Sequence, residues 1–224
     1  MRHLHYLHGF AASPSSTKAA RFARHLKPSG VEIRCLNYNA PDFATLTVSR
    51  MIAQLEADLA TLPSGPVALI GSSLGGFVAV HAAVRQAARS AAGVPSRTPI
   101  DRLVLLAPAF EFGRSSFGTI DAEGIERWRQ SGWLEVHHWG EDRLRSVHFG
   151  LYEDAQLYNS FAEHVSVPTL VFQGRHDAAV DPAMVQRFVA GQPTMSIRMV
   201  DDDHLLMENI DMIVRESAAF LGVR

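Results

Sequence analysis

The chain has 224 residues, of which 47% are hydrophobic and 20% are charged, and its formal net charge is −2. This length favours a single domain, 1–224, and the apolar fraction excludes a largely disordered protein. The near-balanced charge gives no electrostatic reason to expect nucleic acid or an anionic membrane surface as a partner. The one cysteine, Cys35, allows neither an internal disulfide nor a cysteine-based zinc site.

The N-terminus does not resemble a targeting segment. Its first ten residues carry one arginine and three histidines and lack a continuous apolar core. The longest apolar stretch, 66–84, approaches the length of a membrane span, but it contains Gly71, Ser72 and Ser73. It divides into a strand, a turn and a helix. We therefore expect a cytoplasmic protein with no membrane span.

Short apolar runs alternate with helical patterns along the chain. The expected strands are 3–7, 31–38, 67–70, 103–106, 169–172 and 196–200. The expected helices are 16–26, 46–62, 74–88, 182–189 and 210–221. Strands that are apolar on both faces and separated by helices predict an α/β fold, with a parallel sheet of about six strands covered on both sides.

One stretch, 109–167, interrupts this alternation and carries all three tryptophans of the chain. Its expected elements are a helix over 121–130, a hairpin of 133–139 and 143–149, and a further helix over 151–161. A long aromatic insert of this kind is typical of a lid over a binding site, with Trp128 and Trp133 as candidate substrate contacts. The alternative is that these rings form a small core for the insert itself.

The strongest chemical signal is Gly71-x-Ser73-x-Gly75, between an apolar strand and an alanine-rich helix. A serine held at such an abrupt turn has a strained backbone, and side chains two positions away would meet neighbouring backbone, so both are glycine. The positive end of the following helix favours an oxyanion there. Ser73 is therefore the predicted nucleophile, whereas Ser72 should point elsewhere.

A serine hydroxyl needs a base to take its proton and an acid to orient that base. In proteins with this serine turn, the acid and then the histidine follow late strands. His204, directly after the last strand, is the predicted base, and Asp177, after the preceding strand, is the predicted acid. Asp181 is a weaker candidate because it fits a helix cap, and Glu111 remains as an alternative acid.

An oxyanion hole needs two backbone N–H groups. Leu74, the residue after the nucleophile, and Phe10, in the loop after the first strand, are the predicted donors, and Gly9 lets that loop approach the serine closely. His8 is expected to fix the loop by hydrogen bonding, although an ordinary turn is the alternative. The alternating pair His3 and His5 lacks carboxylate-rich company, so we expect structural roles and no metal.

Residues 6–19 (YLHGFAASPSSTKA) and 71–77 (GSSLGGF) resemble the YqiA-like small bacterial esterases, and the whole chain resembles the α/β-hydrolase superfamily. The chain departs from that family at Asp202 and Asp203, where the family tends to carry glycine and asparagine. The resemblance implies an α/β-hydrolase fold that acts without a cofactor. Outside the insert, the chain is too short for the full eight-stranded fold, so a trimmed sheet is expected.

The leading functional hypothesis is a serine esterase or thioesterase that cleaves small-molecule esters of apolar acyl groups through an acyl-enzyme on Ser73. A second hypothesis keeps the same three residues but transfers the acyl group to another acceptor, forms a peracid, or cleaves a carbon–carbon bond. A third is a non-catalytic binding protein on the same fold, because a fold does not determine a function.

Overall fold

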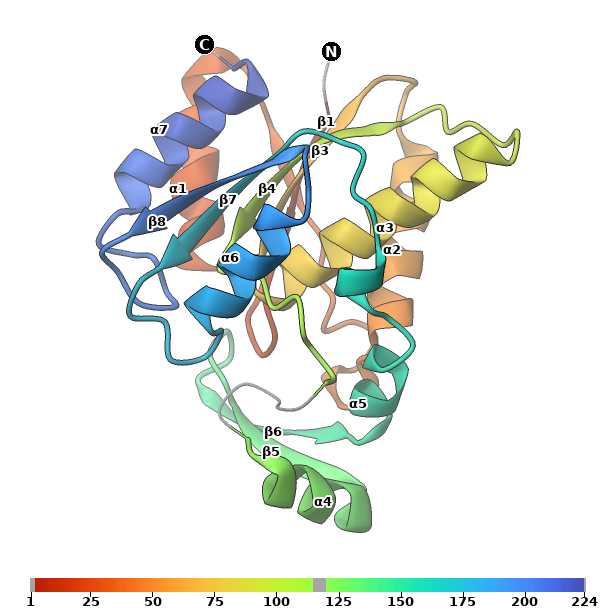
Figure 1. The fold of residues 1–224 in the computed structure, drawn as a ribbon, viewed down its shortest axis with the longest axis vertical. Coiled ribbons are helices and arrows are strands. Elements are labelled where there is room, and N and C mark those ends of the chain that lie inside the picture. The colour runs from red at the N-terminus through yellow and green to blue at the C-terminus, as the bar shows by residue number, and fades with distance from the viewer. Residues whose placement is uncertain (1–2, 115–119, 224) are drawn as a thin grey trace.

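A six-stranded parallel sheet forms the centre of the protein (Figure 1), seen here in a computed structural model that describes residues 3–114 and 120–223. The strand order is β2-β1-β3-β4-β7-β8, and every neighbouring pair is parallel. The strands are β1 (His3–Leu7), β2 (Ile33–Cys35), β3 (Val67–Ser72), β4 (Ile100–Leu106), β7 (Thr169–Gly174) and β8 (Met195–Val200). The prediction of a trimmed, six-stranded sheet is confirmed.

Helices cover both faces of this sheet. On one face lie α1 (Thr17–Leu26) and α7 (Ile210–Leu221), and on the other lie α2 (Val48–Thr61), α3 (Leu74–Ala91) and α6 (Pro182–Ala190). Along β3, Leu69 packs into the core beneath α2 and α3, whereas Ile70 packs toward α1 and α7. Successive side chains of a strand point to opposite faces, and burying each such side chain stabilises the fold by roughly 1.5–3 kcal/mol.

Two expected elements are shorter than the sequence pattern suggests. β2 covers only Ile33–Cys35, because it is an edge strand paired with β1 alone and the chain leaves the sheet before Tyr38. The helix expected over 151–161 is α5 (Gly150–Ala155), followed by a 3-10 turn, η3 (Ser160–Ala162). The chain turns between them, where the hydroxyl of Tyr158 meets that of Ser49 at 2.8 Å.

The insert between β4 and β7 forms a small cap beyond one end of the sheet (Figure 1). It contains α4 (Ala122–Ser131) and the antiparallel hairpin of β5 (Trp133–His138) and β6 (Arg143–His148), as the sequence predicts, followed by α5. Residues 115–119 of the predicted insert lie outside the described residues. The remaining short elements of the fold are the 3-10 turns η1 (Lys27–Ser29) and η2 (Phe43–Thr45).

Aromatic rings of the cap pack against one another and continue the core that lies beneath α2 and α3. The ring of Trp128 lies 5.4 Å from that of Phe149 and 6.2 Å from that of Tyr152, measured between centroids. The Trp128 indole N–H donates to the carbonyl of Val147 at 3.1 Å, so its polar atom is satisfied inside the cap. Among the helices that the structure describes, none is long and apolar enough to cross a membrane.

Candidate active site

Ser73 stands at the turn from β3 into α3, with φ 51° and ψ −116°. A positive φ is uncommon for a residue with a side chain and stores on the order of 1–3 kcal/mol of strain. The glycines on either side are required by close packing. A Cβ on Gly71 would lie 2.5 Å from the carbonyl oxygen of Gly75, and one on Gly75 would lie 2.1 Å from that of Leu7.

The loop after β1 passes directly beside this serine. A Cβ on Gly9 would lie 3.3 Å from the Cβ of Ser73 and 3.2 Å from the carbonyl oxygen of Ser72. Ser72 itself is buried, whereas Ser73 is partly exposed. The two serines of the turn therefore occupy different environments, and Ser73 is the one beside the β1 loop.

His8 fixes the course of this loop. Its Nε2 accepts the N–H of Tyr38 at 3.2 Å, so its proton sits on Nδ1, which donates to the carbonyl of Gly9 at 2.9 Å. Burial lowers the pKa of His8 to about 4, so the ring is neutral at physiological pH. The expected role of His8, and the close approach at Gly9, correspond to these contacts.

Asp177 and His204 form a hydrogen-bonded pair on the loops after β7 and β8. His204 Nδ1 lies 2.8 Å from Asp177 Oδ2, and the Asp177 side chain is fully buried. Burial would raise the pKa of Asp177, but the hydrogen bond and charge of His204, with hydrogen bonds from Val180 and Gln173, lower it overall. This carboxylate is therefore ionised and suited to hold an imidazole in one orientation.

The strand order explains how distant segments meet here. β3, β4, β7 and β8 are consecutive and parallel, so their carboxyl ends lie along one edge of the sheet. Ser73, Asp177 and His204 each follow the carboxyl end of a strand at this edge. Ligand sites in open parallel sheets are typically found outside these strand ends.

The alternative acids are engaged elsewhere. Asp181 accepts the N–H of Ala183 at 2.9 Å and so caps α6, as its sequence position suggests. Glu111 forms an exposed ion pair with Arg187 at 3.1 Å. Of the three carboxylates considered from sequence, the structure therefore brings Asp177 to His204.

Three supporting residues were not anticipated. Gln173, buried at the end of β7, donates from Nε2 to Asp177 Oδ2 at 2.9 Å. Asp202 is buried and accepts the N–H of Asn209 at 2.9 Å, which ties the His204 loop to the start of α7. A glutamine closing an otherwise apolar strand was the available sequence signal for the first. Lys18 is the third.

Lys18 lies in the first turn of α1 and is half-buried. Burial lowers the pKa of its ammonium group to about 8, against the opposing influence of the carboxylates of Asp177, Asp203 and Asp202. The Lys18 ammonium group therefore interacts electrostatically with the carboxylates that follow β7 and β8. The sequence contained no signal for this, because α1 follows the first strand whereas the three carboxylates follow the last two.

The contacts found for the two aromatic candidates are with other residues of the cap. Trp128 is buried in the cap core, and the half-exposed Trp133 packs its ring against His148 at 5.1 Å. His3 and His5 serve structural contacts, with Nε2 of His5 2.8 Å from a carboxylate oxygen of Asp58. Within residues 3–114 and 120–223, no group of three His, Cys, Asp or Glu side chains is placed to hold a metal ion.

Solved structures with the same fold come from several organisms. A candidate hydrolase from Agrobacterium vitis S4 superposes with a TM-score of 0.85 at 22% identity, covering 97% of this chain and 87% of that one. The mouse alpha/beta hydrolase domain-containing protein 10 gives 0.72 at 18% identity, covering 98% and 89%. Est1E from Butyrivibrio proteoclasticus, solved with ferulic acid bound, gives 0.75 at 17% identity, covering 99% and 88%.

Comparison at the level of sequence identifies the family of the chain. No curated protein sequence matches the chain significantly. The model of an uncharacterised protein family, UPF0227, matches residues 3–221, which is nearly the whole chain. With its trimmed parallel sheet, its serine turn and these structural neighbours, the chain has the α/β-hydrolase fold and belongs to the UPF0227 family.

Proposed function

We propose that this protein is a serine hydrolase of carboxylic esters or thioesters, with Ser73 as nucleophile, His204 as general base and Asp177 as the orienting acid. The observation that carries the proposal is the combination of a strained Ser73 turn with the hydrogen bond between the buried Asp177 and the partly exposed His204 at the same sheet edge. A strained serine beside a strand end has no evident structural purpose, and an imidazole held at Nδ1 leaves Nε2 free for catalysis.

The reaction follows from these roles. Ser73 Oγ attacks the acyl carbonyl carbon while His204 Nε2 takes the hydroxyl proton, and Asp177 stabilises the resulting imidazolium. The backbone N–H groups of Leu74 and Phe10 donate to the oxyanion. Collapse of the tetrahedral intermediate breaks the ester bond, and His204 gives its proton to the departing alcohol or thiol. Water then attacks the acyl-enzyme by the same route and releases the acid.

The substrate class is proposed from the cap and from the structural neighbours. The aromatic content of the cap supports a preference for apolar acyl groups, and Trp133 remains the proposed contact because half of its side chain is exposed. Two neighbours are Est1E, with ferulic acid bound, and a monoacylglycerol lipase from Paleococcus ferrophilus (TM-score 0.73, 14% identity). Both names fit a small-molecule ester substrate.

The test uses p-nitrophenyl esters of two to twelve carbons, with wild type and Ser73→Ala. We expect wild type to hydrolyse at least the shorter esters and Ser73→Ala to lose nearly all of that rate. Ser90→Ala, an exposed serine in the last turn of the same helix, is the matched control and should behave as wild type. A fluorophosphonate probe should label wild type on Ser73 only.

The outcomes separate the hypotheses. Equal ester turnover by wild type and Ser73→Ala would refute the nucleophile, and a folded protein that is neither active nor labelled would be a binding protein instead. Where labelling succeeds, competition among water, alcohol and peroxide as acyl acceptors distinguishes hydrolysis from acyl transfer and peracid formation, since all three share the acyl-enzyme.

A further inference from the structure

The tip of the cap hairpin, residues 138–143, lies against the loop that follows β1. We call residues 8–13 of that loop the oxyanion loop, because they include the proposed donor Phe10. A Cβ on Gly140 would lie 2.6 Å from the Cβ of Ser13 and 2.9 Å from its Oγ. The hairpin backbone therefore approaches the oxyanion loop as closely as a glycine allows, across more than a hundred residues of sequence.

A row of rings makes a second connection. The Phe10 ring lies 5.5 Å from that of Phe43, and the Phe43 ring lies 4.9 Å from that of His138 at 89°, an edge-to-face contact. The His138 side chain is fully buried. Aromatic ring pairs in such arrangements stabilise one another beyond the area that they bury. The row links the proposed oxyanion donor to the hairpin through Phe43, which belongs to neither.

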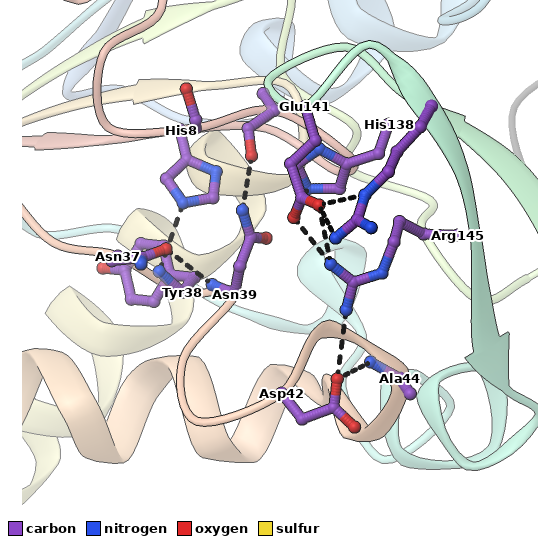
Figure 2. A network of polar contacts seen from close by, with 12 residues as sticks. His8, Asn37, Tyr38, Asn39, Asp42, Ala44, His138, Glu141 and Arg145 are labelled. Carbon is purple, nitrogen blue, oxygen red and sulfur yellow. Dashed lines mark hydrogen bonds and ion pairs between the residues drawn. The ribbon is translucent and has the colours of Figure 1, made fainter.

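Phe43 lies in a bridging segment, residues 37–45, that binds both partners through polar contacts (Figure 2). Toward the oxyanion loop, Asn39 donates from Nδ2 to the carbonyl of Ala12 at 2.8 Å, and the N–H of Tyr38 donates to His8. Toward the hairpin, Arg145 pairs with Asp42 at 3.2 Å and with Glu141 at 2.6 Å. The same short segment thus holds the loop on one side and the hairpin on the other.

His138 is the residue of the tip that this packing encloses. Within the described residues, neither nitrogen of its ring has a hydrogen-bond partner, and the nearest carboxylate oxygen, on Glu141, is 4.0 Å from Nε2. The ring therefore contributes by its shape and its contact with Phe43 rather than by a polar bond. A phenylalanine of similar size should fill the same space, whereas an alanine would leave a cavity behind Phe43.

We propose that the hairpin tip is a positioning element for the oxyanion loop, with His138 as the positioning residue that supports Phe43 and, through it, Phe10. This inference rests on the proposed function for its catalytic consequence. Oxyanion donors act by being preorganised, and removing one costs about 10²–10³ in kcat. A loop that loses its support should cost a part of that, about 10- to 100-fold, while leaving ground-state binding largely intact.

The kinetic test compares His138→Ala, His138→Phe and His137→Ala on a short p-nitrophenyl ester. We expect His138→Ala to lower kcat by about 10- to 100-fold with KM changed less than about threefold. His138→Phe should restore most of kcat. His137, the neighbouring histidine on the opposite, half-exposed side of the strand, is the matched control and should be near wild type. A raised KM with unchanged kcat would overturn the proposal, because His138 would then line the substrate site.

Hydrogen exchange gives a readout that does not depend on ester turnover. In His138→Ala, the backbone amides of residues 8–13 should exchange faster than in wild type, with little change in His137→Ala. If wild type hydrolyses no ester, the proposed function fails, but the exchange rates still test whether the hairpin tip positions the oxyanion loop. Unchanged exchange at residues 8–13 in His138→Ala would refute the positioning role of the hairpin tip, whatever the rate of ester hydrolysis.

A second variant covers the case in which His138→Ala fails to fold. Gly140→Ala leaves the ring row intact but places a methyl group against Ser13, at a backbone position outside the left-handed region. It should lower kcat and alter exchange at 8–13 without raising KM. If the tip does not position the loop, this variant should be indistinguishable from wild type in both measurements.

Discussion

Replacing Asp177 with asparagine changes the proton pattern of the proposed site while retaining its shape. One oxygen of Asp177 accepts the N–H groups of Ala179 and Val180 at 2.9 and 2.8 Å, and the other accepts from His204 and from Gln173. An asparagine keeps its carbonyl oxygen toward the two backbone donors. Its amide group then faces the ring of His204 with hydrogens instead of lone pairs.

The magnitude follows from the tautomer of His204. With an amide donor opposite, Nδ1 must accept, so the proton moves to Nε2 and the ring can no longer take a proton from Ser73. In serine triads this change lowers kcat about 10⁴-fold, which corresponds to about 5.5 kcal/mol of transition-state stabilisation. The new amide group would also face the N–H donor of Gln173, so two donors would meet without an acceptor. This lowers the free energy of unfolding by about 1–3 kcal/mol, a loss that a domain of ordinary stability tolerates.

The assay measures kcat on a short p-nitrophenyl ester together with the thermal unfolding midpoint. Asp181→Asn is the matched control, since this carboxylate caps α6 and should lose little or no activity. If folded Asp177→Asn keeps more than about a tenth of the wild-type kcat, Asp177 does not orient the base. The same measurement on Glu111→Gln would then test the remaining candidate acid.

Further predictions concern the serine turn and the buried histidines. Gly75→Ala would place a Cβ 2.1 Å from the carbonyl oxygen of Leu7, so it should abolish activity and lower the yield of folded protein. Gly191→Ala should fold normally, because its Cβ would lie 3.5 Å from the carbonyl oxygen of Phe188, an ordinary van der Waals contact. Equal unfolding midpoints for the two variants would contradict the packing argument. Burial lowers the pKa of His8 and of His81 to about 4, against about 6.5 when unfolded. Each residue therefore contributes stability that is complete above pH 6.5 and is lost as the pH falls toward 4, up to about 3 kcal/mol per residue. Urea midpoints should fall over this window, with a shallower slope in His81→Gln, and a flat profile would show that neither ring is held neutral.

Local patterns in the sequence were sufficient for the secondary structure of the sheet core and for the serine turn. Apolar runs such as that of β3 and the period of α2 depend on residues within one element, and the glycines around Ser73 answer a steric demand of that turn. The ends of β2 and α5 were not predictable in this way. They depend on an edge position and on a contact with Ser49, both set by distant parts of the chain.

At the candidate site the same division holds. Sequence order after strands nominated Asp177 and His204, and the three-dimensional structure places them 2.8 Å apart. No periodicity could indicate that Gln173 bonds Asp177 or that Trp128 lies inside the cap, because an aromatic or polar residue type does not specify its partner.

The length of the chain and the clustering of its tryptophans in 109–167 indicate one trimmed domain with an aromatic insert. Only tertiary structure decided what the insert contacts. Its hairpin meets the oxyanion loop at Gly140 and Ser13, which come together through the folding of the intervening sheet and helices. Contacts between residues so far apart in the sequence depend on how helices and strands pack together. The pattern of residues along the chain indicates each helix or strand, but it does not indicate which other element that helix or strand packs against.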